Sequence, residues 1–197
     1  DQAVSKRFKV RLANGKNTIR AIAFNDDNSM QSNEALFEVE ARLATSRKPS
    51  VHALVIGIEK FNNPRLNLEF SVADAKLFAD VIKDHSPGLF ETVNVRLLVS
   101  PQETTKDSLI AAMSEIQKTV HPEDLFVFYV ASHGTVDEGE YFLVTSNVGV
   151  TSTARLRQDA IPQTLLKELL GNVPATKKLI VLDTCNSGQM VSQDMQS

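Results

Sequence analysis

Two residues with reactive side chains, His133 and Cys185, each follow a run of apolar residues that ends abruptly in polar ones. The runs span residues 125–131 and 179–182. An unbroken apolar run bounded by polar turn residues is typical of a strand that is buried on both faces. In open α/β sheets, the functional site forms at the carboxyl ends of such strands. We therefore expect His133 and Cys185 to lie at the same edge of one sheet.

These residue types predict nucleophilic acyl-transfer chemistry. A free thiol is only a few per cent ionised at neutral pH, so Cys185 needs a neighbouring imidazole, such as His133, to become an efficient nucleophile. The backbone N–H groups near Gly134 and at Cys185 are candidates for an oxyanion hole. Because side chains alternate along a strand, we expect Asp183 to point the same way as Cys185. Its carboxylate would then bind a cationic substrate side chain.

The composition is that of an ordinary globular protein, with 42% hydrophobic and 23% charged residues among 197. The net charge of −3 gives no reason to expect nucleic acid or an anionic membrane as a partner. No apolar stretch approaches the ~20 residues of a membrane helix. The single cysteine cannot form an internal disulfide, which favours a reducing, cytoplasmic compartment. No glycine-rich phosphate-binding motif occurs, and no cofactor is expected.

Strands alternate with helices from residue 51 onward, which predicts an α/β fold with a mostly parallel sheet flanked by helices. The expected strands are 51–58, 93–99, 125–131 and 178–183, with a short strand at 141–144. The expected helices are 71–84, 104–120 and 161–170. Ser71 with Asp74, and Thr104 with Asp107, have the spacing of capping pairs at helix starts.

The first 43 residues have a different, β-type pattern. Alternating strands are expected at 7–12, 18–24 and 35–39, with Asn14-Gly15 as a hairpin turn. Two or three strands are marginally stable alone, so residues 1–43 resemble the end of an immunoglobulin-like β-sandwich. Its other strands would lie upstream, since the chain begins at Asp1 rather than at methionine. Residues 44–50 are expected to be a linker, and residues 51–197 the second domain.

Four short motifs occur in order along the second domain. They are His52-Ala-Leu-Val-Ile-Gly-Ile58, Ser71-Val-Ala-Asp-Ala75, Phe128-Tyr-Val-Ala-Ser-His-Gly134 and Leu182-Asp-Thr-Cys-Asn-Ser-Gly188. Together they resemble the caspase-like cysteine peptidases, peptidase family C14, and most of all the prokaryotic and metacaspase branch. The 52-residue separation of His133 and Cys185 is similar to the spacing of about 50 in caspases. The resemblance implies His133 as base, Cys185 as nucleophile, and Asp183 and Asp74 as acids that bind a substrate Arg or Lys.

The chain also departs in places from the pattern of the families that it resembles. Animal caspases carry an arginine shortly before the first helix to bind a substrate aspartate, whereas residues 66–70 contain none. Metacaspases usually have histidine after the cysteine, where this chain has Asn186. They often have serine two residues before the histidine, where this chain has Ala131. These differences leave the catalytic pair of His133 and Cys185 intact. They concern the residues expected around the substrate pocket.

The resemblance implies a cysteine endopeptidase that cleaves after Arg or Lys. It would belong to a larger multidomain protein that is activated by proteolytic processing and acts in prokaryotic defence or cell death. Its partners would be a protein or peptide substrate, a small-subunit half of the fold beyond Ser197, and an upstream regulatory or sensor domain. The alternatives are a catalytically inactive caspase-like scaffold, supported by Ala131 and Asn186, and a related clan peptidase with another specificity.

The remaining titratable groups are interpreted as structural. His52, His85 and His121 lack a comparable context. Metacaspases often bind calcium through acidic residues. We interpret the acidic pairs of this chain as parts of solvated loops instead; they are Asp26-Asp27 and Asp137-Glu138. We expect no metal site, with calcium dependence as the alternative that the resemblance leaves open.

Overall fold

The computed structural model describes residues 5–10, 12–25, 30–42 and 47–184, and it divides the chain into two compact units, Asp1–Arg47 and Lys48–Ser197. The first unit contains an antiparallel pair of strands, β1 (Gly15–Ala21) and β2 (Ala35–Ala41). One face of this pair is charged, and Lys16 there forms an ion pair of 2.7 Å with Glu38. The other face is apolar: Ile19 pairs with Phe37, whose side chain is 57% exposed.

The predicted hairpin at Asn14-Gly15 is wrong. Residues 5–10 form no strand, and Gly15, with a φ of +92°, begins β1. The Asn17 side chain accepts a hydrogen bond from the Ala13 N–H at 2.9 Å and donates one to the Ala13 carbonyl at 2.8 Å. These local bonds hold the entry into β1 and compete with strand pairing there.

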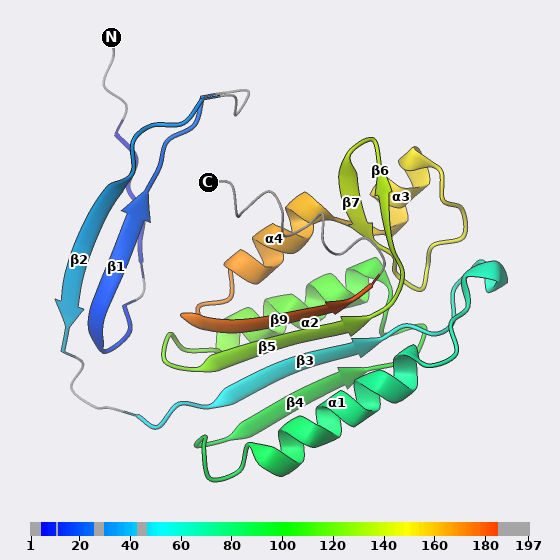
Figure 1. The fold of residues 1–197 in the computed structure, drawn as a ribbon, viewed down its shortest axis with the longest axis horizontal. Helices are drawn as coiled ribbons and strands as arrows, with labels where there is room; N and C mark the ends of the chain where they lie inside the picture. Colours follow the sequence, from blue (N-terminus) through cyan, green and yellow to red (C-terminus); the bar gives the residue numbers. More distant parts are fainter. Residues whose placement is uncertain (1–4, 11, 26–29, 43–46, 185–197) are drawn as a thin grey trace. The chain divides into compact units, whose positions relative to one another are not determined.

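A four-stranded parallel sheet forms the centre of the second unit, in the order β4-β3-β5-β9. Its strands are β3 (Val51–Gly57), β4 (Val93–Leu98), β5 (Leu125–Ala131) and β9 (Lys177–Asp183). Figure 1 shows helix α1 (Ser71–His85) on one face of the sheet, and α2 (Lys106–Thr119) and α4 (Gln163–Gly171) on the other. The predicted mixed α/β fold with a parallel sheet is therefore confirmed.

Each face of the sheet has its own apolar core. Val55 and Tyr129 pack on the α1 side, whereas Leu54 and Phe128 pack on the side of α2 and α4. Because helices cover both faces, β3 is buried along nearly its whole length, as its continuous apolar sequence predicts. Each such side chain, when fully buried, stabilises the fold by about 1.5–3 kcal/mol.

The end of β3 lies directly against the start of α1. A Cβ atom on Gly57 would lie 2.5 Å from the Ser71 carbonyl oxygen and 2.8 Å from the Ala75 Cβ, so only glycine fits there. The Ser71 hydroxyl donates to the Ile58 carbonyl at 2.7 Å. The predicted capping role of Ser71 is therefore wrong: Phe70 is the N-cap residue, and Ser71 connects the strand end to the helix.

Other boundaries also differ from the predicted ones. Thr105, rather than Thr104, caps α2 and accepts the Ser108 N–H at 3.3 Å. The helix expected from residue 161 begins at Gln163, because Ile161 pairs with Leu143 in a small antiparallel sheet. The remaining elements are η1 (Pro64–Leu66), β6 (Gly134–Asp137), β7 (Glu140–Leu143), α3 (Thr153–Asp159) and β8 (Ile161–Pro162).

Strand β9 is the outermost strand on its side of the sheet in the described part of the chain. Val181 packs towards α1 and Leu182 towards the opposite core, but Leu179 is 48% and Ile180 42% exposed. The prediction that this strand is buried on both faces is therefore wrong for the described residues. Among those residues, none of the helices has the length and apolar character that a membrane crossing requires.

Candidate active site

The carboxyl ends of β5 and β9 lie side by side. Ala131 is paired with Asp183 in the parallel register, and the Ser132 N–H donates to the Asp183 carbonyl at 3.2 Å. The chain leaves β5 into His133 and leaves β9 into Thr184. Cys185 follows next in the sequence but lies outside the described residues, so its assignment as nucleophile stays a prediction. The structure does place His133 and the residue before Cys185 at one edge of the sheet.

His133 is half-buried, and the loop between β3 and α1 orients its ring. The Nε2 atom lies 2.8 Å from the Leu66 carbonyl oxygen. A carbonyl oxygen can only accept a hydrogen bond, so Nε2 must carry the proton. In the neutral ring, Nδ1 is then left as the acceptor, as a general base requires. The Phe61 ring packs against the imidazole, with ring centroids 5.4 Å apart.

Hydrogen bonds within the same loop hold the Leu66 carbonyl in place. Asn67 Oδ1 accepts the Phe61 N–H at 3.0 Å, and Asn63 Oδ1 accepts the Arg65 N–H at 3.1 Å. Two asparagine side chains thus fold the loop around η1. The tautomer of His133 is fixed by a backbone group that is itself fixed by its neighbours in the loop.

A pocket of about 420 Å³ opens beside His133. It is lined by Leu68, Glu69, Phe70, Ser71, Asp74, Ala131, Ser132, His133, Asp183 and Thr184. The predicted site residues His133, Asp183 and Asp74 therefore come together, from the ends of two strands and the first turn of α1. Ala131 is also part of the wall, at the position where metacaspases often have serine.

Tyr129 lies on the α1 side of β5, two residues before Ala131, and its ring stacks on Phe78 with centroids 4.3 Å apart. Burial raises the pKa of Tyr129 to about 12, with further contributions from the charges of Asp183 and Asp74 and from a hydrogen bond to Asp183. A phenol that keeps its proton donates to the Asp183 carboxylate. The two acids thus act on one side chain, and their negative charges lie at the same part of the site.

Gly134 is buried at the start of β6. The Val144 N–H donates to the His133 carbonyl at 3.0 Å, and the Ser132 hydroxyl donates to the Val144 carbonyl at 2.8 Å. Hydrogen-bonded and non-bonded pairs alternate in antiparallel strands, so Gly134 and Leu143 form a non-bonded pair. Pairing with β7 therefore does not take up the Gly134 N–H.

Sequence reasoning missed several residues at this edge. The Leu66 carbonyl and the Phe61 ring reach His133 from a distant loop, and a backbone carbonyl leaves no signature in a sequence. Tyr141 in β7, whose hydroxyl contacts Thr184, was predicted only as part of a strand. Tyr129 alone had a signal, because strand alternation puts it on the same face as Ala131.

The remaining histidines lie elsewhere. His52 Nε2 and His121 Nδ1 lie 3.4 Å and 3.7 Å from one oxygen of Asp124, a buried carboxylate that also accepts the Ser50 N–H. This cluster joins the amino ends of β3 and β5, the opposite end from His133. His85 is the last residue of α1.

Of the acidic pairs considered for calcium, Asp26 and Asp27 lie outside the described residues. The Asp137 Oδ2 atom is buried and has no hydrogen-bond partner among the residues that the structure describes. Glu138 lies 3.3 Å from Arg157. Within the described part of the chain, no three His, Cys, Asp or Glu side chains gather in a way that could hold a metal ion.

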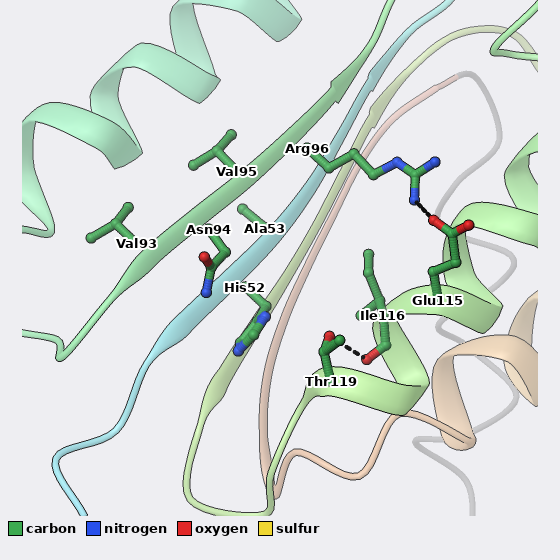
Figure 2. Close-up of a pocket in the computed structure, with 9 residues that line it drawn as sticks. All are labelled: His52, Ala53, Val93, Asn94, Val95, Arg96, Glu115, Ile116 and Thr119. Atoms are coloured by element: carbon green, nitrogen blue, oxygen red, sulfur yellow. Dashed lines mark hydrogen bonds and ion pairs between the residues drawn. The ribbon is translucent and has the colours of Figure 1, made fainter.

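A second hollow, of about 590 Å³, lies between β4 and α2 (Figure 2). Arg96 and Glu115 form an ion pair across it, and the Thr119 hydroxyl is bonded to the Ile116 carbonyl. Its charged groups are thus paired with each other, and none of the predicted catalytic residues that the structure describes lines it.

The architecture and the site at the strand ends define an open α/β protein of the type that places its chemistry at the carboxyl edge of a parallel sheet. The caspase-domain model matches residues 50–197, and the chain therefore belongs to the caspase-domain family and carries a cysteine-peptidase-like scaffold. Comparison with curated proteins finds no match.

Among solved structures, the chain is similar to a crystal structure of a protein from Geobacter sulfurreducens, with a TM-score of 0.54 and 18% sequence identity. The similarity covers 75% of this chain and 55% of the other. This chain thus spans about half the length of that protein, and the likeness shows the fold alone.

Proposed function

We propose that the chain is the large-subunit portion of a cysteine endopeptidase that cleaves after arginine or lysine. The observation that carries the proposal is the pocket in which Asp74 and Asp183, from different elements, lie beside His133. The described residues that line it include three acids and neither lysine nor arginine. Such a pocket favours a cationic substrate side chain and disfavours an anionic one.

The chemistry follows from the tautomer of His133. Its Nδ1 atom takes the proton of the Cys185 thiol, and the thiolate attacks the scissile carbonyl carbon. The N–H groups of Gly134 and Cys185 stabilise the oxyanion of the tetrahedral intermediate. The imidazolium then gives its proton to the leaving amine, and a water molecule, deprotonated by the same ring, hydrolyses the thioester.

The test of specificity uses fluorogenic peptides that end in Arg, Lys or Asp. We expect cleavage of the first two, and kcat/KM for the Arg peptide to fall about 10- to 100-fold in Asp183→Asn and in Asp74→Asn, as for loss of a hydrogen bond to a charged group. Asp80→Asn is the matched control, because Asp80 lies on α1 but is exposed and paired with Lys83. Cleavage of the Asp peptide alone would refute the pocket assignment.

The inactive-scaffold alternative rests on Ala131 and Asn186, of which only Ala131 is described. An electrophilic peptide that ends in Arg decides between the two functions. A peptidase forms a covalent adduct with Cys185, the only cysteine in the sequence, whereas an unreactive thiol in the activated protein favours the scaffold.

The proposed partners fit two exposed apolar surfaces. At the outer edge of the sheet, Leu179 and Ile180 in β9 are 48% and 42% exposed, which suits an edge covered by the small-subunit half. In the first unit, the apolar face around Ile19 and Phe37 suits the second sheet of an upstream β-sandwich. Proteolytic activation and a role in prokaryotic defence or cell death rest on the family resemblance alone.

A further inference from the structure

The hydroxyl groups of Tyr141 and Thr184 are hydrogen-bonded, with 2.7 Å between their oxygens. Tyr141 lies in β7, its side chain is 1% exposed, and its ring belongs to the core shared with α2 and α4. Thr184 is the last described residue and directly precedes Cys185 in the sequence. A rigid, buried side chain therefore holds the segment from which the proposed nucleophile extends.

The residue that directly follows β7 is also bonded to the proposed base. Three residues after Tyr141, the Val144 N–H donates to the His133 carbonyl at 3.0 Å, and the Ser132 hydroxyl donates to the Val144 carbonyl at 2.8 Å. The segment 141–144 thus contacts both the proposed base, His133, and Thr184, the residue before the proposed nucleophile. Its contacts with His133 are made by the backbone, and its contact with Thr184 depends on one phenolic hydroxyl.

We infer that Tyr141 is a positioning residue that fixes the separation between His133 and Thr184, the residue that precedes Cys185 in the sequence. This inference rests on the proposed dyad. A buried tyrosine usually places its hydroxyl on a partner simply to satisfy it, and packing alone explains the ring. The position of the partner carries the inference, because Thr184 directly precedes the proposed nucleophile in the sequence, and Val144, which directly follows β7, donates to the His133 carbonyl.

The chemistry makes this separation critical. Transfer of the thiol proton to His133 Nδ1 leaves a thiolate and an imidazolium, whose attraction falls with distance. Reacting groups must also lie about 3–3.5 Å apart, and a misplacement of about 1 Å can cost 100-fold in rate. The described residues around the substrate pocket do not include Tyr141, so its loss should affect thiol reactivity and kcat rather than KM.

The test measures alkylation of Cys185 by iodoacetamide between pH 5 and pH 10, with mass spectrometry to verify the site, in Tyr141→Phe, Thr184→Val and the double variant. We expect the rate at pH 7 to fall about 5- to 10-fold in each single variant and no further in the double variant, because both act through one hydrogen bond. The pH midpoint of alkylation should rise towards the ~8.5 of a free thiol. Thr184→Ser, which keeps the hydroxyl, should restore the wild-type rate.

Thr176→Val is the matched control, since the Thr176 hydroxyl makes a bond of 2.8 Å to the Pro122 carbonyl just before β9, at the opposite end of the strand. Alkylation profiles in Tyr141→Phe and Thr184→Val that equal the Thr176→Val profile would overturn the inference. His133→Ala separates this failure from failure of the proposed function. If His133→Ala leaves the profile unchanged, the dyad itself is refuted; if it raises the midpoint while Tyr141→Phe does not, only the positioning role is refuted.

Discussion

At the scale of single residues, the candidate site depends on backbone and side-chain groups that hold other groups in place. The Leu66 carbonyl fixes the proton of His133 on Nε2, and Tyr129 donates to the carboxylate of Asp183. Neither contact belongs to the proposed catalytic dyad itself. The chemistry assigned to His133 and Asp183 therefore depends on neighbours that a motif of catalytic residues does not include.

Tyr129 gives a prediction for stability at alkaline pH. The folded protein holds this proton up to a pKa of about 12, whereas an unfolded tyrosine releases it near pH 10. The unfolded state therefore binds fewer protons between pH 10 and pH 12, and the free energy of unfolding falls as the pH rises through that window.

Tyr129→Phe should remove this contribution. We expect the wild type to lose on the order of 1–2 kcal/mol more than the variant between pH 10 and pH 12, and the difference to stay constant below pH 9. Urea unfolding at a series of pH values measures both. Parallel stability curves for the two proteins would show that the Tyr129 proton is not held by the fold.

At the scale of elements, the loop between β3 and α1 acts on the site as a unit. Because the Leu66 carbonyl cannot be removed by substitution, the loop has to be loosened instead. Asn67→Ala removes the acceptor of the Phe61 N–H. We expect kcat to fall about 10-fold with KM little changed, since the loop orients the proposed base, whereas Asp74 and Asp183 lie on α1 and β9.

Asn62→Ala is the control for the loop. Its side chain donates to the Asn147 carbonyl at 3.1 Å and so points out of the loop rather than folding it. Steady-state kinetics on the Arg peptide compare the two variants, and circular dichroism checks that both are folded. Equal losses of kcat in Asn67→Ala and Asn62→Ala would contradict the role assigned to the loop.

At the scale of the whole molecule, the exposed side of β9 predicts how stability changes when the small-subunit half is present. In the chain of 197 residues, Ile180 is 42% exposed, so Ile180→Lys should change the free energy of unfolding by only about 0.5 kcal/mol. In a protein that includes the second half, the same lysine would be buried and should cost more than about 2 kcal/mol.

Leu89→Lys provides the comparison, because Leu89 is 69% exposed in the turn after α1, away from β9, and should cost little in both proteins. Chemical unfolding of both lengths gives the four values. If Ile180→Lys costs the same in the short and the long protein, no further strand covers this side of the sheet.

The sequence predicted the order of the main strands and helices because burial on two faces leaves a long apolar run, as in β3 and β5. It also brought His133, Asp183 and Asp74 to one site, through strand alternation and family resemblance. It failed where one local signal competed with another: at Asn14-Gly15, the side-chain hydrogen bonds of Asn17 to Ala13 form in place of the predicted hairpin turn. The apolar sequence of β9 likewise predicts burial on both faces. In the described part of the chain, however, no element packs over Leu179 and Ile180, which are partly exposed.

The close packing of Gly57 against α1 has a consequence for how substrate preference could change. Asp74 lies in the first turn of that helix. Its distance from Asp183 therefore depends on how closely α1 packs against the end of β3 at Gly57. A single added methyl group there would push the helix outward and widen the pocket without altering any residue that lines it. The width of the proposed substrate pocket thus depends on a glycine that does not line it.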